Sequence, residues 1–165
     1  MKNLITTFSL LLVAGFCLAQ NFEKEINTQV WKPFIDAYSK FDTEKFMALH
    51  STNVIRVSQD EKKIFNFTDY KKNIARENQF NKNYNIKANI ELRFQERIHS
   101  EILAYETGFF KISVIENTGK NATVYGKFQV TLQKEKGTWK ILVDSDTSEG
   151  GSVTEKDFLS AKSME

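Results

Sequence analysis

The chain has 165 residues, a formal net charge of +2 at pH 7 and 14 phenylalanines. This length fits one domain better than two. Lysines are spread along the chain beside acidic residues, without a basic stripe of the kind that binds nucleic acid or a polybasic segment that binds a membrane surface. The composition therefore argues against a nucleic-acid-binding protein and favours a well-packed domain rich in β-sheet.

The first 19 residues have the layout of a secretory signal peptide. Lys2 supplies a short positive region, residues 4–16 form an uncharged apolar run, and Cys17 and Ala19 are the small residues expected just before a cleavage site. The apolar run is too short to cross a bilayer comfortably, although a retained membrane anchor is the alternative. We therefore expect cleavage after Ala19, export to the periplasm or the extracellular space, and no contact with a membrane afterwards.

Cys17 is the only cysteine of the chain. Bacterial lipoprotein signals have a small residue before the modified cysteine, whereas this position is Phe16, so we expect no lipid attachment. Cleavage after Ala19 also removes the only thiol. The mature protein is then expected to have no disulfide and no metal held by cysteine.

Three helices are expected in the first half of the chain. Apolar residues recur at three- and four-residue steps over 22–40, with a kink or a true helix start at Pro33. Asp42 is a candidate N-cap for a short second helix that ends at His50. A third helix is expected over about 68–81.

The second half is expected to form a β-sheet. Residues 86–98 alternate between apolar and polar side chains, with Ile98 continuing the apolar face. The other expected strands cover 53–58, 63–65, 102–116, 123–133 and 138–147. Residues 149–165 are expected to be a tail in which Thr154 can cap one short helix.

Helices followed by a β-meander indicate an α+β fold. A sheet made of such long strands must twist and coil. We therefore expect a cone-shaped, curved antiparallel sheet with three N-terminal helices packed on its concave face. A cavity between these two layers is the kind of place in which small-molecule sites form.

Several segments resemble the nuclear transport factor 2-like superfamily. They are Lys40-Phe41-Asp42, Ala104-Tyr105-Glu106-Thr107-Gly108-Phe109-Phe110, Gly126-Lys127-Phe128, and Gly137-Thr138-Trp139-Lys140-Ile141 through Asp144 to Ser148. The chain is most similar to the polyketide cyclase and ketosteroid isomerase-like group, among its small domains of unknown function. The resemblance covers residues 22–148 and places a domain at 20–148. It implies a conical pocket and a homodimer packed through the outer face of the sheet. The acid–base pair of the catalytic members has no clear counterpart here.

Glu106 is the first candidate catalytic residue. Its alternation with Ala104 and Phe110 places it on the apolar face of its strand, where a carboxylate is costly to bury unless it is paired or protonated. It could be a pocket base or ligand anchor, with Gly108 leaving room for a ligand beside it. The alternatives are a structural partner such as Arg56, or a bulge near Gly108 that turns the carboxylate outward.

Asp144 is the second candidate catalytic residue. It alternates oppositely to Trp139 and Ile141 along the last strand. It also matches the aspartate that is common at the end of the last strand in the resembled superfamily, which implies a pocket role. Structural pairing is an equal alternative, and Asp146 is expected to be exposed.

Six further residues are candidates for lining a ligand pocket. They are Trp31, Tyr38, His50, Arg56, Phe110 and Phe128. His50, at the expected end of a helix, would interact favourably with the helix C-terminus. His99 lies on the polar strand face near a turn, so we expect it to be solvated. Neither histidine has acids at ligand spacing, so we expect no metal and no other cofactor.

Three functions are compatible with these residues. The first is an exported domain that binds a small apolar or carbonyl-bearing molecule. The second is an isomerase- or cyclase-type enzyme in which Glu106 or Asp144 is the general base and Tyr38 stabilises an oxyanion. The third is an interaction module that forms a dimer through the outer sheet face, with Arg93 and Arg97 on the surface.

Overall fold

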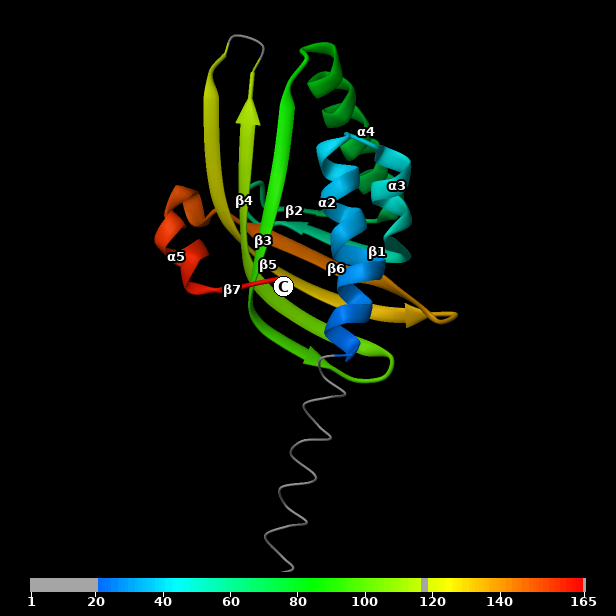
Figure 1. The fold of residues 1–165 in the computed structure, drawn as a ribbon. Helices are drawn as coiled ribbons and strands as arrows, with labels where there is room; N and C mark the ends of the chain where they lie inside the picture. The colour runs from blue at the N-terminus through cyan, green and yellow to red at the C-terminus, as the bar shows by residue number, and fades with distance from the viewer. Residues whose placement is uncertain (1–20, 117–118, 165) are drawn as a thin grey trace, which may run out of the picture.

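The computed structural model describes residues 21–116 and 119–164, so the expected signal peptide over 1–19 lies outside the described residues. Figure 1 shows the helices gathered on one side of a curved sheet, with the C-terminal segment on the other side. Within the described ranges, no helix is long and apolar enough to cross a membrane.

The first helix is interrupted just before Pro33. Residues 21–26 are helical, Asn27–Trp31 form one π-helical turn, and α2 then runs over Lys32–Ser39 with Pro33 in its first turn. Proline has no N–H and disturbs the i→i−4 ladder of a helix, so an irregular turn directly before it is where a break is expected. The expected break at Pro33 is therefore confirmed as a change of helix type.

The next two helices have side-chain N-caps. The α3 helix spans Thr43–Ala48, and the Asp42 carboxylate accepts a hydrogen bond from the backbone N–H of Lys45 at 3.1 Å, as expected. The α4 helix spans Phe67–Asn83 and is capped by Asn66, one turn earlier than the sequence indicates. Because α3 ends at Ala48, the prediction that His50 ends a helix is wrong.

Seven strands form one sheet in the order β2-β1-β6-β5-β4-β3-β7. All neighbours are antiparallel except β1 and β6, which are parallel. The sheet is curved and not closed, and the helices contact β1, β3 and β6, so the expected α+β fold is confirmed. The strands are β1 (His50–Ser58), β2 (Lys63–Phe65), β3 (Lys87–His99), β4 (Leu103–Ile115), β5 (Asn121–Glu135), β6 (Thr138–Thr147) and β7 (Lys162–Ser163).

The described strand pairs have three register shifts: one between β1 and β6, at His50 to Ile55, and two one-residue bulges, on β3 and β6. On β3, Phe94 pairs with Gly108 but Glu96 pairs with Thr107, so Gln95 is an extra residue. On β6, Leu132 pairs with Ile141 but Thr131 pairs with Val143, so Leu142 is extra. An extra residue reverses the face on which every following side chain lies. These two reversals determine which polar residues enter the interior.

The C-terminal segment covers part of the convex face. The expected short helix is confirmed as α5 (Glu155–Ser160), and Thr154 caps it through a hydrogen bond from the N–H of Asp157. Phe158 packs with Phe109 of β4 in a small buried apolar cluster. The β7 strand then pairs with Phe94 at the edge of β3, which the sequence analysis did not predict. The expected outer-face homodimer stays a prediction, and part of that face is occupied by this segment.

Candidate functional site

Glu106 lies in the interior and binds four donor groups. Its side chain is 0% exposed. Its Oε1 accepts from Arg97 Nε at 2.9 Å and from His99 Nε2 at 2.8 Å, and Arg97 Nη2 lies 2.9 Å from the same oxygen. Its Oε2 accepts from the indole N–H of Trp31 at 2.6 Å. The expected inward orientation of Glu106 is confirmed, and β4 has no bulge near Gly108.

The partners of Glu106 differ from those expected. Arg56 is not among them. Arg97 and His99 were expected on the solvated face, yet their side chains are only 9% and 3% exposed. The bulge at Gln95 is the cause, because it turns both side chains inward and leaves Ile98 55% exposed on the opposite face. The predictions for Arg97, His99 and Ile98 are therefore wrong for one shared reason.

The Glu106 cluster, defined as Glu106, Arg97, His99, Trp31 and Asn27, is a closed structural unit. Asn27 accepts from Arg97 Nη2 at 2.8 Å and donates to the carbonyl of Met164 at 3.0 Å, so the cluster links the first helix to the C-terminal segment. A carboxylate with its oxygens occupied by four donors has little capacity left to accept a substrate proton. We therefore find Glu106 unsuited to the general-base role expected of it.

The space beside Gly108 is also filled. A side chain there would meet the carbonyl of Arg93 at 2.0 Å and the ring of Phe128 at 2.7 Å. Gly108 is therefore explained by close packing of the neighbouring strand and of Phe128, and the expected room for a ligand beside Glu106 is not there.

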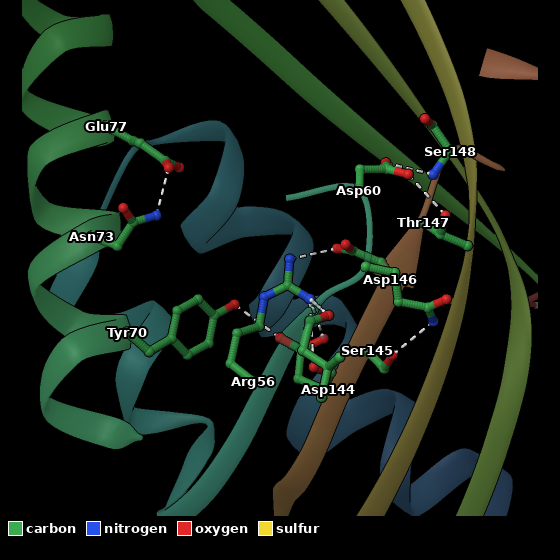
Figure 2. Close-up of polar contacts among 12 residues, drawn as sticks. Arg56, Asp60, Tyr70, Asn73, Glu77, Asp144, Ser145, Asp146, Thr147 and Ser148 are labelled. Atoms are coloured by element: carbon green, nitrogen blue, oxygen red, sulfur yellow. Dashed lines mark hydrogen bonds and ion pairs between the residues drawn. The ribbon is translucent and has the colours of Figure 1, made fainter. Parts of the chain in front are cut away.

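Asp144 is the centre of a second polar cluster, and Figure 2 shows it with Arg56, Tyr70 and Asp146. Its Oδ2 accepts from the hydroxyl of Tyr70 on α4 at 2.8 Å and lies 3.5 Å from His50 Nε2 on β1. Its Oδ1 is 3.8 Å from Nη1 of Arg56, whose Nη2 lies 2.7 Å from Asp146. We call these five residues, Asp144, Asp146, Arg56, Tyr70 and His50, the Asp144 cluster.

The bulge at Leu142 brings both aspartates to the concave side. Before the bulge, Trp139 and Ile141 lie in the apolar core, and strict alternation would place Asp144 on the opposite face. After the bulge, Asp144 pairs across from Val130 and Asp146 from Phe128, both of which belong to that same core. Asp144 therefore pairs with neighbouring side chains in the interior, which is the structural alternative that the sequence left open.

The two aspartates have opposite pKa shifts. Burial would raise the pKa of Asp144, but the charge of Arg56 and the neighbouring His50 and Tyr70 outweigh it and lower that pKa to about 2. Burial, against the opposing charge of Arg56 and together with the charge of Asp144, raises the pKa of Asp146 to about 6. Asp144 thus has Arg56, His50 and Tyr70 to stabilise its charge, whereas the charge of Asp146 is stabilised by Arg56 and opposed by Asp144.

Arg56 lies between Tyr70 of α4 and Asp146 of β6 (Figure 2). Burial and the nearby Asp144 raise the pKa of Tyr70 well above its ordinary value, so its hydroxyl remains a donor. Arg56 also donates to the carbonyl of Val57 at 3.0 Å, which fixes the guanidinium in place. Asp146 keeps 34% of its side chain exposed, so the expected exposure is confirmed only in part.

His50 lies behind Asp144, with a side chain that is 0% exposed. Its Nδ1 lies 3.0 Å from the carbonyl oxygen of Phe46, and because a carbonyl only accepts, Nδ1 carries a proton. This bond is the contact with a helix C-terminus that the sequence indicates. Among the described residues its Nε2 has no hydrogen-bond partner, and it faces Oδ2 of Asp144 at 3.5 Å.

Of the other predicted pocket residues, three are packed in the protein interior and Tyr38 lines a small hollow. Trp31 and Phe128 are buried in the core, and the ring of Phe110 occupies the space that a side chain at Gly126 would fill. Tyr38 lines a hollow of about 60 Å³ beside α4. Burial, and then the negative charges of Glu77 and Asp146, raise the pKa of Tyr38 to about 12.

Sequence reasoning missed Arg97, His99, Tyr70 and Asp146 as site residues. A signal for Asp146 is present, because residues two apart on a strand share a face and Asp144 was already a candidate. No glycine or proline marks Gln95, so nothing in the sequence indicates the reversal that buries Arg97 and His99. Among the described residues, no group of three or more His, Cys, Asp or Glu side chains could hold a metal ion.

No protein-family model and no curated protein matches this sequence. Solved structures do match. A conserved protein from Planctomyces limnophilus DSM 3776 has a TM-score of 0.63 and 19% identity over 76% of this chain and 94% of that chain. A nuclear transport factor 2-like protein of unknown function from Pseudomonas putida KT2440 has a TM-score of 0.61 and 10% identity over 78% of this chain and 87% of that chain.

A third match is a nuclear transport factor 2-like superfamily protein from Salmonella enterica serovar Typhimurium LT2. It has a TM-score of 0.64 and 11% identity over 78% of this chain and 91% of that chain. Identities this low establish architecture and leave activity open, because one fold serves many functions. The chain therefore has the nuclear transport factor 2-like fold that its sequence resemblance indicates.

Proposed function

We propose that this protein is an exported domain that binds a small apolar or carbonyl-bearing molecule on the concave face, with the polar group of the ligand at Asp146. One observation carries the proposal. In the Asp144 cluster, Asp146 is the carboxylate that combines partial exposure with a pKa raised to about 6. A titratable group that is perturbed in this way marks a candidate site.

The surroundings of Asp146 supply what such a ligand would need. Arg56 is held in one orientation by Val57 and the two aspartates, so it presents a fixed positive charge. Burial raises the pKa of Tyr38 to about 12, with a smaller contribution from the charges of Glu77 and Asp146, so its hydroxyl stays protonated and can donate. Phe110 on the concave face is only partly buried and adds an apolar surface. Polar groups at one end of an apolar surface would orient a ligand.

The test is direct binding with a matched pair of variants. Native mass spectrometry of the purified protein would detect a retained small molecule, and a thermal-shift screen would use apolar ketones and aromatic aldehydes as probes. We expect Asp146→Asn to weaken binding of the retained molecule or best probe at least about fivefold, the effect of losing one hydrogen bond to a charged group. Asp36→Asn, an exposed helix position, should leave binding unchanged. Equal affinities of the two variants would contradict the proposal.

Export is tested separately. The proposal requires the secreted form to begin at Gln20, directly after the small-residue pattern that ends at Ala19. N-terminal sequencing of protein from the periplasm or medium should therefore give Gln20. An intact Met1, or a lipid on Cys17, would contradict export as a free protein.

A second candidate function is general-base catalysis of the isomerase or cyclase type. The observation in its favour is the separation of the two aspartate pKa values, about 2 for Asp144 and about 6 for Asp146, because such divergence assigns distinct roles to paired carboxylates. Asp146 replaces the expected Glu106 and Asp144 as the base, since it is the partly exposed one. Proton NMR in heavy water should show exchange of the α-hydrogens of a ketone probe, falling below about pH 6. Exchange that persists in Asp146→Asn would exclude this role.

A further inference from the structure

The convex face carries a polar hollow that the proposed function does not use. It has a volume of about 330 Å³. That value lies in the range of small-molecule pockets, which begins at about 300 Å³. Amide, hydroxyl and backbone groups dominate its lining, with one lysine and one glutamate at the rim. The lining residues are Gln59, Gln95, Thr107, Gly108, Lys127, Phe128, Gln129, Ser145, Thr147 and Glu149.

Strand register arranges the amides and hydroxyls in a row across the sheet. Ser145 on β6 is directly opposite Gln129 on β5, which is directly opposite Thr107 on β4. The bulge on β3 adds Gln95 beside Thr107, and Gln59 extends the row at the other end by donating to Ser145 Oγ at 3.0 Å. Neighbouring strands are about 4.8 Å apart, so the row presents hydrogen-bonding groups at regular intervals.

Three of these side chains have unused hydrogen-bonding capacity. Within the part of the chain that the structure describes, Gln95, Thr107 and Gln129 form no side-chain hydrogen bond. An amide offers two donors and an acceptor, and a hydroxyl offers both functions, so the row can donate and accept at each step. The charges at the rim are paired with each other, because Lys127 Nζ lies 2.7 Å from Glu149. The hollow therefore offers hydrogen-bond donors and acceptors but carries no net charge.

We propose that this hollow is a binding site for a neutral saccharide. Saccharide hydroxyls both donate and accept, as the row does, and they carry no charge that would need a counter-ion. The bulge supports this assignment, because bulges re-aim side chains beside functional sites, and this one presents Gln95 on the convex face. The site is separate from Asp146, which lies on the concave side of the same strand.

A second copy of the chain is the less favoured occupant. The centre of a stable interface is mostly apolar and poor in charge. Beside the hollow, Phe109 lies opposite the lining residue Lys127, and Phe109 and Tyr125 are already covered by Val153 and Phe158 of the C-terminal segment. What remains uncovered at the hollow is the polar row, which suits a hydrated ligand better than a protein partner.

The experiment compares three variants of one residue type. Cellotetraose, maltotetraose and chitotetraose serve as neutral probes, with oligogalacturonate as a charged one, in ligand-observed NMR followed by calorimetry. Gln129→Ala and Gln95→Ala remove groups of the row, whereas Gln133→Ala removes a glutamine from the same strand and face as Gln129, outside the hollow. Circular dichroism and melting curves confirm that each variant folds.

We expect at least one neutral saccharide to bind and the charged probe to bind more weakly. Each row variant should weaken binding about fivefold, the loss typical of one hydrogen bond, while Gln133→Ala changes it less than twofold. The proposal is overturned if no neutral saccharide binds at about 10 mM, where Kd values far above 1 mM would still give a signal. It is equally overturned if all three variants bind alike, or if sedimentation velocity shows a dimer that Gln129→Ala dissociates.

Discussion

Glu106 and Asp144 are two buried carboxylates on the same face of one sheet, and each has an arginine and a histidine beside it. They differ in the balance of charge. Glu106 is one carboxylate shared by Arg97, His99 and Trp31, so donors exceed acceptors. In the Asp144 cluster a second carboxylate, Asp146, lies 2.7 Å from the single arginine, whereas the second carboxylate near Arg97 is the exposed Glu23 at 3.7 Å. Burial alone is therefore a poor marker of a candidate reactive acid. A partly exposed carboxylate whose negative charge is only partly balanced by its neighbours is a better marker.

The largest expected effect on stability is at the Glu106 cluster. Replacing Glu106 by Gln removes the buried charge partner of Arg97, leaves only the exposed Glu23 at 3.7 Å, and should lower the free energy of unfolding by about 3–5 kcal/mol. Urea denaturation at pH 7 measures the change. Glu101→Gln, an exposed control in the loop before β4, should stay within about 0.5 kcal/mol. A loss below about 1 kcal/mol for Glu106→Gln would show that Glu23, 3.7 Å from Arg97, is a sufficient charge partner.

Asp144→Asn should cost less, about 2 kcal/mol, because Arg56 keeps its contact with Asp146. The pH dependence gives an independent check. Asp144 has its pKa lowered from 3.8 to about 2, so its contribution to stability is present above pH 3.8 and is lost as the pH falls through 2. Acid denaturation of the variant should therefore lack this part of the transition. A loss of unfolding free energy as large as that of Glu106→Gln would show that Asp146 does not balance the charge of Arg56 in the variant.

Asp146→Asn is expected to change stability at pH 7 by less than about 1 kcal/mol, in either direction. Its pKa is raised from 3.8 to about 6, so the ionised form costs stability above pH 6 and the protonated form restores it as the pH falls towards 3.8. Carbon-13 NMR of the side-chain carboxyl should show a midpoint near 6. A midpoint near 4 would instead mean that the charge of Arg56 balances the charges of both aspartates.

The smallest expected effect tests the bulge that creates the Glu106 cluster. Ile98 lies beyond Gln95 and is 55% exposed, so Ile98→Asp should change the unfolding free energy by only about 0.5 kcal/mol. Leu92 lies before the bulge and is 9% exposed. The same substitution there buries a charge and should cost several times more, whereas alternation without a bulge predicts similar losses at both positions.

The fold and one buried acid could be predicted from the sequence because they depend on local patterns. β4 is regular, so alternation places Glu106 correctly, and Asp42 and Thr154 are helix caps of ordinary type. The partners of the acids could not be predicted. Pairing depends on register across strands, and the extra residues Gln95 and Leu142 are ordinary strand residues that carry no turn or breaker signal.

The pairing of β7 with β3 was missed for a related reason. Its two residues, Lys162 and Ser163, are too short a strand to show any alternation. Only the position of α5 on the convex face brings them to the edge of β3, at Arg93 and Phe94. Tertiary context determines such a strand, and no local pattern does.

The bulge at Gln95 also bears on how this protein could change by insertion and deletion. Removing that one residue would return Ile98 to the interior and send Arg97 and His99 back to solvent, with every neighbouring codon unchanged. Glu106 would then lose both of its basic partners in a single step and keep Trp31. A one-residue length change can thus exchange an apolar interior for a charged one, whereas point mutation would need several intermediates with unpaired buried charges. Relatives that differ in length here should differ in the residue type at position 106 as well.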